Sequence, residues 1–276
     1  MLEIGWFATG RGEGSRGLLR FVQERLLRRQ LDARIEFVFS NREPGEAEGS
    51  DEFFKLANGY GLPLVTFSSG KFRRTMGGPF ANLREDYDRR VMDLLAGYRP
   101  DICVLAGYML IVGGEMCRRY PLLNLHPALP DGPIGTWQEV VWSLIETRSS
   151  RTGAMMHLAT EEVDRGPVLA YCTVPITGGD FDPQWRELAG QDLAQVKADQ
   201  GENFPLFQHI RRAEYQREPC LLYETLRALA EGKVAVRDGT VVDPRGEPLG
   251  VSVSDGLCLD QEIQHALAQG GVPETG

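Results

Sequence analysis

The sequence predicts a doubly wound α/β fold with a mostly parallel sheet, and three observations support this prediction. In residues 1–175, short apolar segments alternate with segments whose apolar residues recur at helical spacing. The apolar run at 101–106 lies between Pro100 and Gly107, as is typical of a strand buried on both faces of a parallel sheet. The chain has 276 residues, 42% of them apolar, and is therefore long enough to bury a large core.

The individual elements follow from local patterns. Apolar runs bounded by turn-forming residues predict strands, and apolar residues three and four apart predict helices. Strands are predicted at 2–8, 33–39, 63–67, 101–106, 122–125, 154–159 and 168–174, and helices at 18–30, 51–58, 84–96, 137–147 and 207–231, the last interrupted at Pro219. The segments 233–237 and 240–242, joined by Asp238-Gly239, predict a small hairpin.

We expect a single domain over residues 1–276, because neither a repeat nor a long linker divides the chain. Its core would span 1–175, followed by a polar insertion at 176–213, a C-terminal helix and hairpin at 214–250, and a tail at 251–276. The last residues, 270–276, are expected to fray. Because the insertion has few clustered apolar residues, we expect it to lack a core of its own.

Composition excludes several classes of function. The chain carries 30 basic and 39 acidic residues, and a net charge of −9 disfavours binding to nucleic acid or to an anionic membrane. Five cysteines without a CxxC pair favour a reducing, cytoplasmic compartment. The four histidines lack zinc-ligand spacing with these cysteines, so no metal is expected. A homo-oligomer remains compatible with the sequence.

The segment 123–127 follows a predicted strand and carries two polar side chains. Residues two apart in an extended chain share a face, so Asn124 and His126 should point the same way, with Leu125 towards the core. An amide donor beside an imidazole suits acyl chemistry, in which one polarises a carbonyl oxygen and the other moves a proton. The alternative is a buried structural histidine followed by a turn.

Two further segments suggest a ligand site. Asp164 lies in a polar turn at 161–167, after the strand at 154–159, and open α/β sheets bind ligands at the carboxyl ends of their strands. The Gly-rich segment 10–17 precedes a helix, where free backbone N–H groups favour an anion. A solvated acidic loop and a flexible turn are the respective alternatives. We interpret the basic residues Lys71, Arg73 and Arg74 as a solvated loop.

Together these segments resemble the glycinamide ribonucleotide formyltransferase family over roughly residues 2–250. The family's Asn-x-His-Pro and Val-Asp-x-Gly-Pro motifs are matched at 124–127 and 163–167. Further similar segments occur in the same order, at 39–41, 82–88, 100–109 and 229–233. The resemblance implies a Rossmann-like formyltransferase that belongs to purine biosynthesis and one-carbon metabolism.

The resemblance also implies an activity. A formyl group would pass from the co-substrate 10-formyltetrahydrofolate to the amine of glycinamide ribonucleotide, without a metal. Asn124 would hydrogen-bond the formyl oxygen, His126 would assist proton transfer, and Asp164 would hold the histidine charged. We therefore expect Asp164 to raise the pKa of His126. The residues implied to contact folate are Arg84, Met109, Leu110, Ile111, Val112, Asn124, Thr160, Glu161, Glu162, Val163 and Asp164, and those implied to bind the acceptor are Gly14, Ser15, Arg16 and Glu214.

Departures from the family pattern bear mainly on the acceptor. Arg16 stands where the family has Asn, Leu110 stands where it has Arg, and residues 178–212 contain an insertion expected to border the acceptor side. Another amine, such as an amino sugar nucleotide, is therefore an alternative acceptor. A folate- or nucleotide-binding regulator without turnover is an alternative of a different class. Pro127 disfavours the related hydrolase, which has a second histidine at that position.

Overall fold

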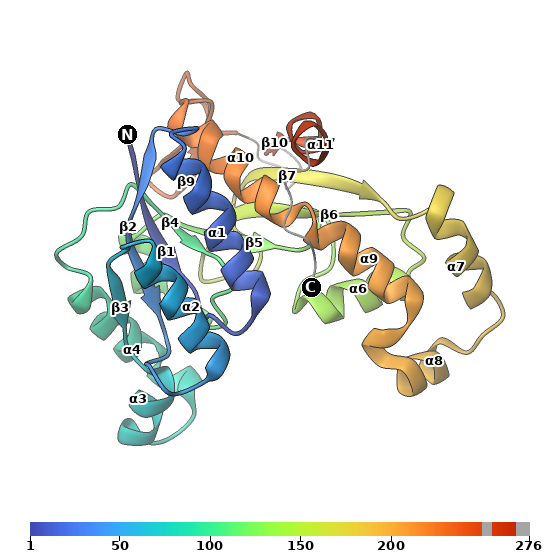
Figure 1. The fold of residues 1–276 in the computed structure, drawn as a ribbon, viewed down its shortest axis with the longest axis horizontal. Coiled ribbons are helices and arrows are strands. Elements are labelled where there is room, and N and C mark those ends of the chain that lie inside the picture. Colours follow the sequence, from blue (N-terminus) through green and yellow to red (C-terminus); the bar gives the residue numbers. More distant parts are fainter. Residues whose placement is uncertain (250–255, 269–276) are drawn as a thin grey trace.

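An eight-stranded sheet forms the centre of the computed structural model, which describes residues 1–249 and 256–268 (Figure 1). The strand order is β10-β7-β6-β5-β4-β1-β2-β3. Strands β1 to β5 run parallel, β6 is antiparallel to both β5 and β7, and β10 pairs parallel to β7. The strands are β1 (Leu2–Phe7), β2 (Ala33–Ser40), β3 (Leu64–Thr66), β4 (Ile102–Leu105), β5 (Leu122–His126), β6 (Arg151–Leu158), β7 (Val168–Pro175) and β10 (Leu257–Cys258), with β8 (Ala235–Arg237) and β9 (Thr240–Val242) in a separate hairpin.

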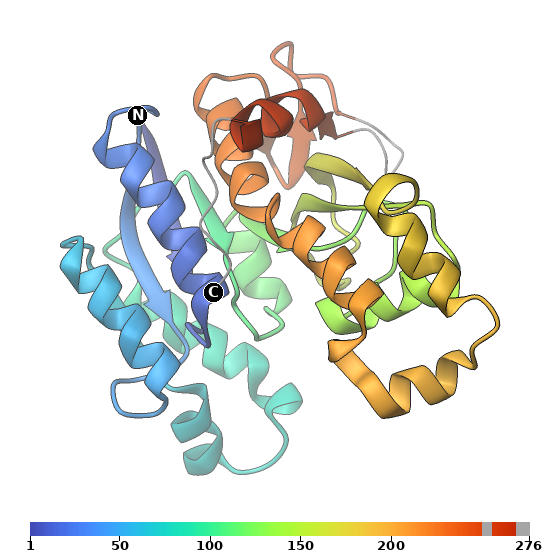
Figure 2. The ribbon, with the colours of Figure 1, turned by 45° about the vertical axis from the view of Figure 1, so that its right-hand side comes forward.

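Helices cover both faces of the sheet, which confirms the predicted doubly wound, mostly parallel α/β class (Figure 2). Alternation along β1 shows why, because Ile4 and Trp6 pack on one face whereas Phe7 packs on the other. The first face holds α1 (Glu13–Leu27), α2 (Glu48–Gly59), α10 (Glu218–Ala230) and α11 (Asp260–Ala268), and the second holds α4 (Phe80–Leu94) and α5 (Gly114–Arg119).

Among the described residues, the insertion shares an apolar cluster with the rest of the chain and does not form a separate core. It folds into α7 (Asp182–Leu188), α8 (Leu193–Gln200) and α9 (Pro205–Tyr215), which pack with α6 (Trp137–Glu146) in a third apolar cluster. Phe204, for example, stacks on Trp142 of α6. The insertion's buried apolar residues are spread along the sequence but converge in space: Leu188 on α7, Val196 on α8, and Leu206, Phe207 and Ile210 on α9.

Most predicted elements are present, with shifted ends. Helix α1 begins at Glu13, so half of the Gly-rich segment is helical. The basic run expected as a loop lies in α3 (Ser69–Met76). The interruption near Pro219 is confirmed, because α9 ends at Tyr215 and α10 begins at Glu218. Within the segment expected as a tail, 257–268 form β10 and α11, whereas the fraying predicted at 270–276 lies outside the described residues.

Candidate active site

A cleft of about 540 Å³ opens at the carboxyl ends of the central parallel strands. Its walls come from the N-terminus of α1, the loop after β4, the end of β5, the loop after β6, and the junction of α9 and α10. The parallel strands end at the same edge of the sheet, so residues far apart in sequence converge there. No helix among the described residues is long and apolar enough to cross a membrane, and no group of His, Cys, Asp or Glu side chains within them could hold a metal.

Asn124 and His126 lie at the end of β5 and point towards a common partner. Asp164, in the loop after β6, places Oδ1 3.2 Å from Asn124 Nδ2 and Oδ2 3.6 Å from His126 Nδ1. Its φ of 55° lies in the left-handed region, which aspartate tolerates better than most residues. The structure thus brings the three residues of the expected site together.

His157 is a fourth member of this cluster that sequence reasoning missed. Antiparallel pairing sets His157 of β6 directly opposite Asn124, and its Nε2 lies 3.1 Å from Asn124 Nδ2 and 3.6 Å from Asp164 Oδ1. A signal was present in the sequence, since this histidine is the only polar residue in the strand predicted at 154–159.

Backbone carbonyl groups fix the proton positions on both imidazoles. His157 Nδ1 lies 3.0 Å from the carbonyl oxygen of Leu158, which can only accept, so Nδ1 carries the proton and Nε2 accepts from Asn124. His126 Nε2 likewise donates to the carbonyl of Pro133 at 3.1 Å, which leaves Nδ1 facing Asp164. Both hydrogens of the Asn124 amide are then engaged, one by His157 and one by Asp164.

The expectation that Asp164 raises the pKa of His126 above its ordinary value is wrong. Burial lowers this pKa, and the opposing charge of Asp164, 3.6 Å away and shared with His157, does not restore it. Burial of Asp164 acts to raise its own pKa, but the neighbouring imidazoles of His157 and His126 lower it overall. At neutral pH the cluster therefore holds a neutral His126 beside an ionised Asp164.

The residues expected to contact folate divide into two groups. Arg84, on α4, and Glu161, which pairs with Arg118 at 2.6 Å, are not among the residues that line the cleft. The exposed apolar side chains of Met109, Ile111 and Val163 lie at the lining and suit a flat heteroaromatic ring. The expected residues that do line it are Met109, Leu110, Ile111, Val112, Asn124, Thr160, Glu162, Val163 and Asp164.

The Gly-rich segment contributes to the cleft through its backbone rather than through its arginine. Gly14 and Ser15 line the cleft in the first turn of α1, where unpaired N–H groups favour an anion. Gly107 permits this approach, because a Cβ there would lie 2.5 Å from Ser15 Oγ. Arg16, expected to bind phosphate, instead pairs with Glu13 at 3.0 Å and does not line the cleft.

Glu214, expected to contact the acceptor, lies in the interior. It is fully buried, accepts a hydrogen bond from Thr152 Oγ1 at 2.7 Å, and does not line the cleft. Burial raises its pKa to about 8, although Thr152 and the Arg211 charge oppose this. The cleft is instead lined by Arg211, Tyr215 and Glu218.

A helical spacing explains this correction. Arg211 and Tyr215, four positions apart on α9, share one side of that helix, and Glu218, the first residue of α10, lies beside Arg211 at the cleft. Arg211 Nη1 lies 2.5 Å from Glu218 Oε1, and its guanidinium lies over the ring of Tyr215, 5.1 Å from the centroid. This spacing was visible in the sequence and suggests a shared face, although it does not show that this face lines the cleft.

Comparisons with known proteins agree with this geometry. The family model described as formyl transferase matches residues 13–186, more than half of the chain. The phosphoribosylglycinamide formyltransferase of Escherichia coli is 31% identical over 156 residues, or 55% of this chain and 70% of that protein. The yeast enzyme of the same name is 33% identical over 36% of this chain and 50% of its own length, so this match spans only half of the yeast protein.

Solved structures share the fold. The phosphoribosylglycinamide formyltransferase of Coxiella burnetii superposes with a TM-score of 0.63 at 20% identity, over 93% of this chain and 99% of that one. A formyltetrahydrofolate deformylase from Pseudomonas syringae also superposes, with a TM-score of 0.60 at 21% identity, over 88% of this chain and 65% of that one. At these identities the likeness establishes the fold alone.

Proposed function

Because this chain belongs to the formyl transferase family, we propose that it transfers a formyl group from 10-formyltetrahydrofolate to the amine of glycinamide ribonucleotide. One observation carries the proposal. The Asn124–His126–Asp164 cluster and the N-terminus of α1 line the same cleft, so acyl-transfer groups lie beside an anion site. The same proposal places the reaction in purine biosynthesis, in the cytoplasm and within a single formyltransferase domain.

The apolar loop after β4 would hold the folate. Its backbone is anchored at both ends, since the Met109 N–H donates to Thr9 Oγ1 at 2.8 Å and the Gly113 N–H donates to Asp88 Oδ2 at 2.6 Å. An anchored loop presents a preformed apolar wall, which lowers the entropic cost of ordering it on binding. When bound, the folate supplies the formyl group.

His126 would act as the general base. Its lowered pKa keeps the imidazole neutral near pH 7, so Nδ1 can accept a proton from the attacking amine. Asp164 Oδ2 faces this nitrogen and stabilises the resulting imidazolium. The same proton can then pass from Nδ1 to the departing nitrogen, so His126 is regenerated neutral.

Asn124 would stabilise the negative charge that develops on the formyl oxygen. In the structure its amide donates to Asp164 and His157, so donation to the formyl oxygen requires one of these bonds to be exchanged. His157 would act as a positioning residue, because its bond to Asn124 holds the amide in place. An oxyanion donor of this kind contributes about 2.7–4 kcal/mol to the transition state.

The proposal is tested by following an isotopically labelled formyl group. Purified protein is incubated with labelled 10-formyltetrahydrofolate and glycinamide ribonucleotide, with an amino sugar nucleotide, or with no acceptor. The proposal predicts label on glycinamide ribonucleotide, at a rate well above the rate of release as formate. Preferential labelling of the amino sugar nucleotide would contradict glycinamide ribonucleotide as the acceptor. Release of formate that no acceptor suppresses would indicate a hydrolase. Folate binding without any turnover would indicate the regulator.

A further inference from the structure

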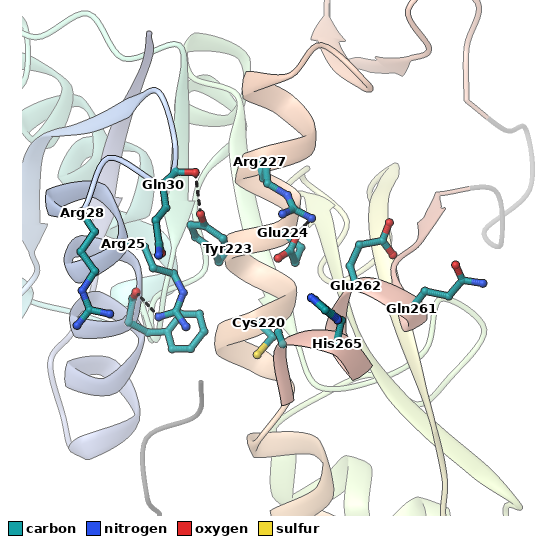
Figure 3. A pocket seen from close by; sticks show the side chains of 12 residues that line it. Arg25, Arg28, Gln30, Cys220, Tyr223, Glu224, Arg227, Gln261, Glu262 and His265 are labelled. Atoms are coloured by element: carbon teal, nitrogen blue, oxygen red, sulfur yellow. Dashed lines mark hydrogen bonds and ion pairs between the residues drawn. The ribbon is translucent and has the colours of Figure 1, made fainter. Parts of the chain in front are cut away.

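A second cavity, of about 730 Å³, lies outside the active-site cleft, where the C-terminal half of α1, the middle of α10 and α11 meet (Figure 3). Its volume is in the range of small-molecule sites. Helix α1 contributes to both hollows, with Ser15 at the cleft and Arg25 at the cavity, about 15 Å apart at 1.5 Å per residue. The proposed reaction does not use this cavity.

One wall of the cavity is cationic. Arg25 lies in the last turn of α1 and Arg28 directly follows the helix, and both line the cavity. The Arg25 guanidinium lies 3.4 Å from the centroid of Phe21 and donates to the Phe21 carbonyl at 3.1 Å, which fixes its plane. Arg28 is well exposed, and its contact with Glu24 is long, at 3.8 Å. Fixed and exposed guanidinium groups of this kind suit the oxygens of a phosphate.

The opposite wall consists of acceptors and amides. Glu262, on α11, lines the cavity and forms no ion pair with the rest of the described chain. Glu224 is already paired with Arg227, and burial, reinforced by the charge of Glu262, raises the pKa of Glu224. The amide of Gln261, also on α11, lines the space as well, whereas Gln30 lies on the side of the arginines (Figure 3). A carboxylate suits vicinal hydroxyl groups, as carboxylates accept from ribose hydroxyls elsewhere.

Helix α11 is held firmly enough to form a wall. Both carboxylate oxygens of Asp260, its first residue, accept from Thr173 of β7, one from the N–H at 2.6 Å and one from the hydroxyl. Ile263 is buried against the sheet face. Helix α11, which carries Glu262, therefore has a fixed place against the sheet.

From these two walls we propose that the cavity is a second ligand site for a phosphorylated ribose. Its phosphate would bind Arg28, with the positive charge of Arg25 nearby, and its hydroxyls would bind Glu262. We infer that the ligand carries a single phosphate group, because a longer polyphosphate would bring more negative charge towards the carboxylate of Glu262. A free sugar phosphate and a nucleoside monophosphate share this chemistry, and the choice between them depends on contacts to a base.

Calorimetric titration of the full chain with ribose 5-phosphate, AMP, inorganic phosphate and ribose tests this proposal. We expect ribose 5-phosphate to bind more tightly than inorganic phosphate or ribose. Equal affinities for AMP and ribose 5-phosphate would identify the sugar phosphate as sufficient, and tighter AMP binding would identify a nucleotide. Inorganic phosphate binding as tightly as ribose 5-phosphate, or no heat from any ligand, would overturn the proposal.

Variants separate this cavity from the active-site cleft. Arg28→Ala should raise the dissociation constant of ribose 5-phosphate at least about fivefold, because a charge-assisted contact is lost. Glu262→Gln should weaken ribose 5-phosphate but not inorganic phosphate. Arg186→Ala, an exposed arginine on α7, is the matched control and should change nothing. Unchanged affinity in both Arg28→Ala and Glu262→Gln would place the ligand in the cleft and overturn the proposal, whatever the acceptor of formyl transfer.

Discussion

The two ends of the active-site cleft differ in how their charges are arranged. The end at the strands holds one ionised carboxylate, Asp164, which is contacted by Asn124 and two histidines. The end at the junction of α9 and α10 holds paired charges, because Arg211 lies between Glu218 and the interior Glu214. The first arrangement has a nitrogen, Nδ1 of His126, that can accept a proton. The second is closed by an ion pair and suits binding and orientation. We infer that chemistry belongs to the first end and acceptor recognition to the second.

The largest expected effect concerns the strand-end cluster. His126→Ala and Asp164→Asn should each lower kcat about a hundredfold or more, because the proton acceptor or the charge that stabilises it is lost. Their double variant should lose less than the product of the two factors, since the pair acts as a unit. Single-turnover formyl transfer at saturating folate measures both effects.

The pH dependence provides a control for this prediction. Since His126 must be neutral to accept a proton, the rate should rise with pH and reach its plateau below neutrality, in keeping with the lowered pKa of His126. Asp164→Asn removes a charge that raises this pKa, so the acid limb should move to lower pH while the plateau rate falls. If kcat of the His126→Ala and Asp164→Asn double variant fell by the full product of the two single factors, this would contradict the pairing of His126 with Asp164.

The residues at the two ends of the cleft differed in how far the sequence could predict them. Asn124 and His126 lie on β5 towards its carboxyl end, and the carboxyl ends of parallel strands in an open α/β sheet lie at one edge whatever the loop lengths. Asp164 follows β6, which is antiparallel to β5, so strand order alone does not bring it to this edge, and its place was implied by the resemblance to the family's two motifs. The pKa of His126 was predicted in the wrong direction, because a sequence shows the neighbouring charge but not the burial.

At the other end, prediction depended on the rotation of a helix. The resemblance implied Glu214 as an acceptor contact, but the helices of the insertion pack on α6 and determine which side of α9 faces the cleft. The spacing of Arg211, Tyr215 and Glu218 predicts a shared face, yet not which face is buried. The doubly wound class and most strands needed no such information, because apolar periodicity alone specifies them.

The interior position of Glu214 predicts an effect on stability. Its pKa is raised to about 8 in the folded protein against an ordinary value of 4.5, so the folded state binds the proton more tightly. The free energy of unfolding should therefore fall as pH rises from 6 to 9, by on the order of 2 kcal/mol. Glu214→Gln, which cannot ionise, should lose this part of the pH dependence.

Urea unfolding at pH 6 and pH 9 measures the difference between the wild type and Glu214→Gln. The groups facing Glu214 are Thr152, Arg211 and Glu218, and the Arg211 charge opposes the shift. Glu187→Gln, at an exposed site on α7, serves as the control for loss of a surface carboxylate. Equal pH dependence in wild type and Glu214→Gln would show that Glu214 is already ionised at pH 6.

A smaller effect distinguishes the backbone of α1 from its arginine. Removing the phosphate from the acceptor should raise its dissociation constant about tenfold, because hydrogen bonds to a charged group are lost at Gly14 and Ser15. Arg16→Ala should change the same constant by less than about threefold, since Arg16 is paired with Glu13 outside the cleft. Calorimetric titration with the phosphorylated and dephosphorylated acceptor makes the comparison. A tenfold rise in the dissociation constant of the acceptor in Arg16→Ala would show that the phosphate binds the Arg16 side chain.

The division of the cleft into a chemical end and a binding end is tested most directly by steady-state kinetics of Asp164→Asn and Glu218→Gln, measured side by side. The account predicts that Asp164→Asn lowers kcat about a hundredfold with little change in the acceptor KM. Glu218→Gln should instead raise the acceptor KM about fivefold with little change in kcat, because it weakens the ion pair with Arg211. A fall in kcat of similar size in both variants would contradict the division.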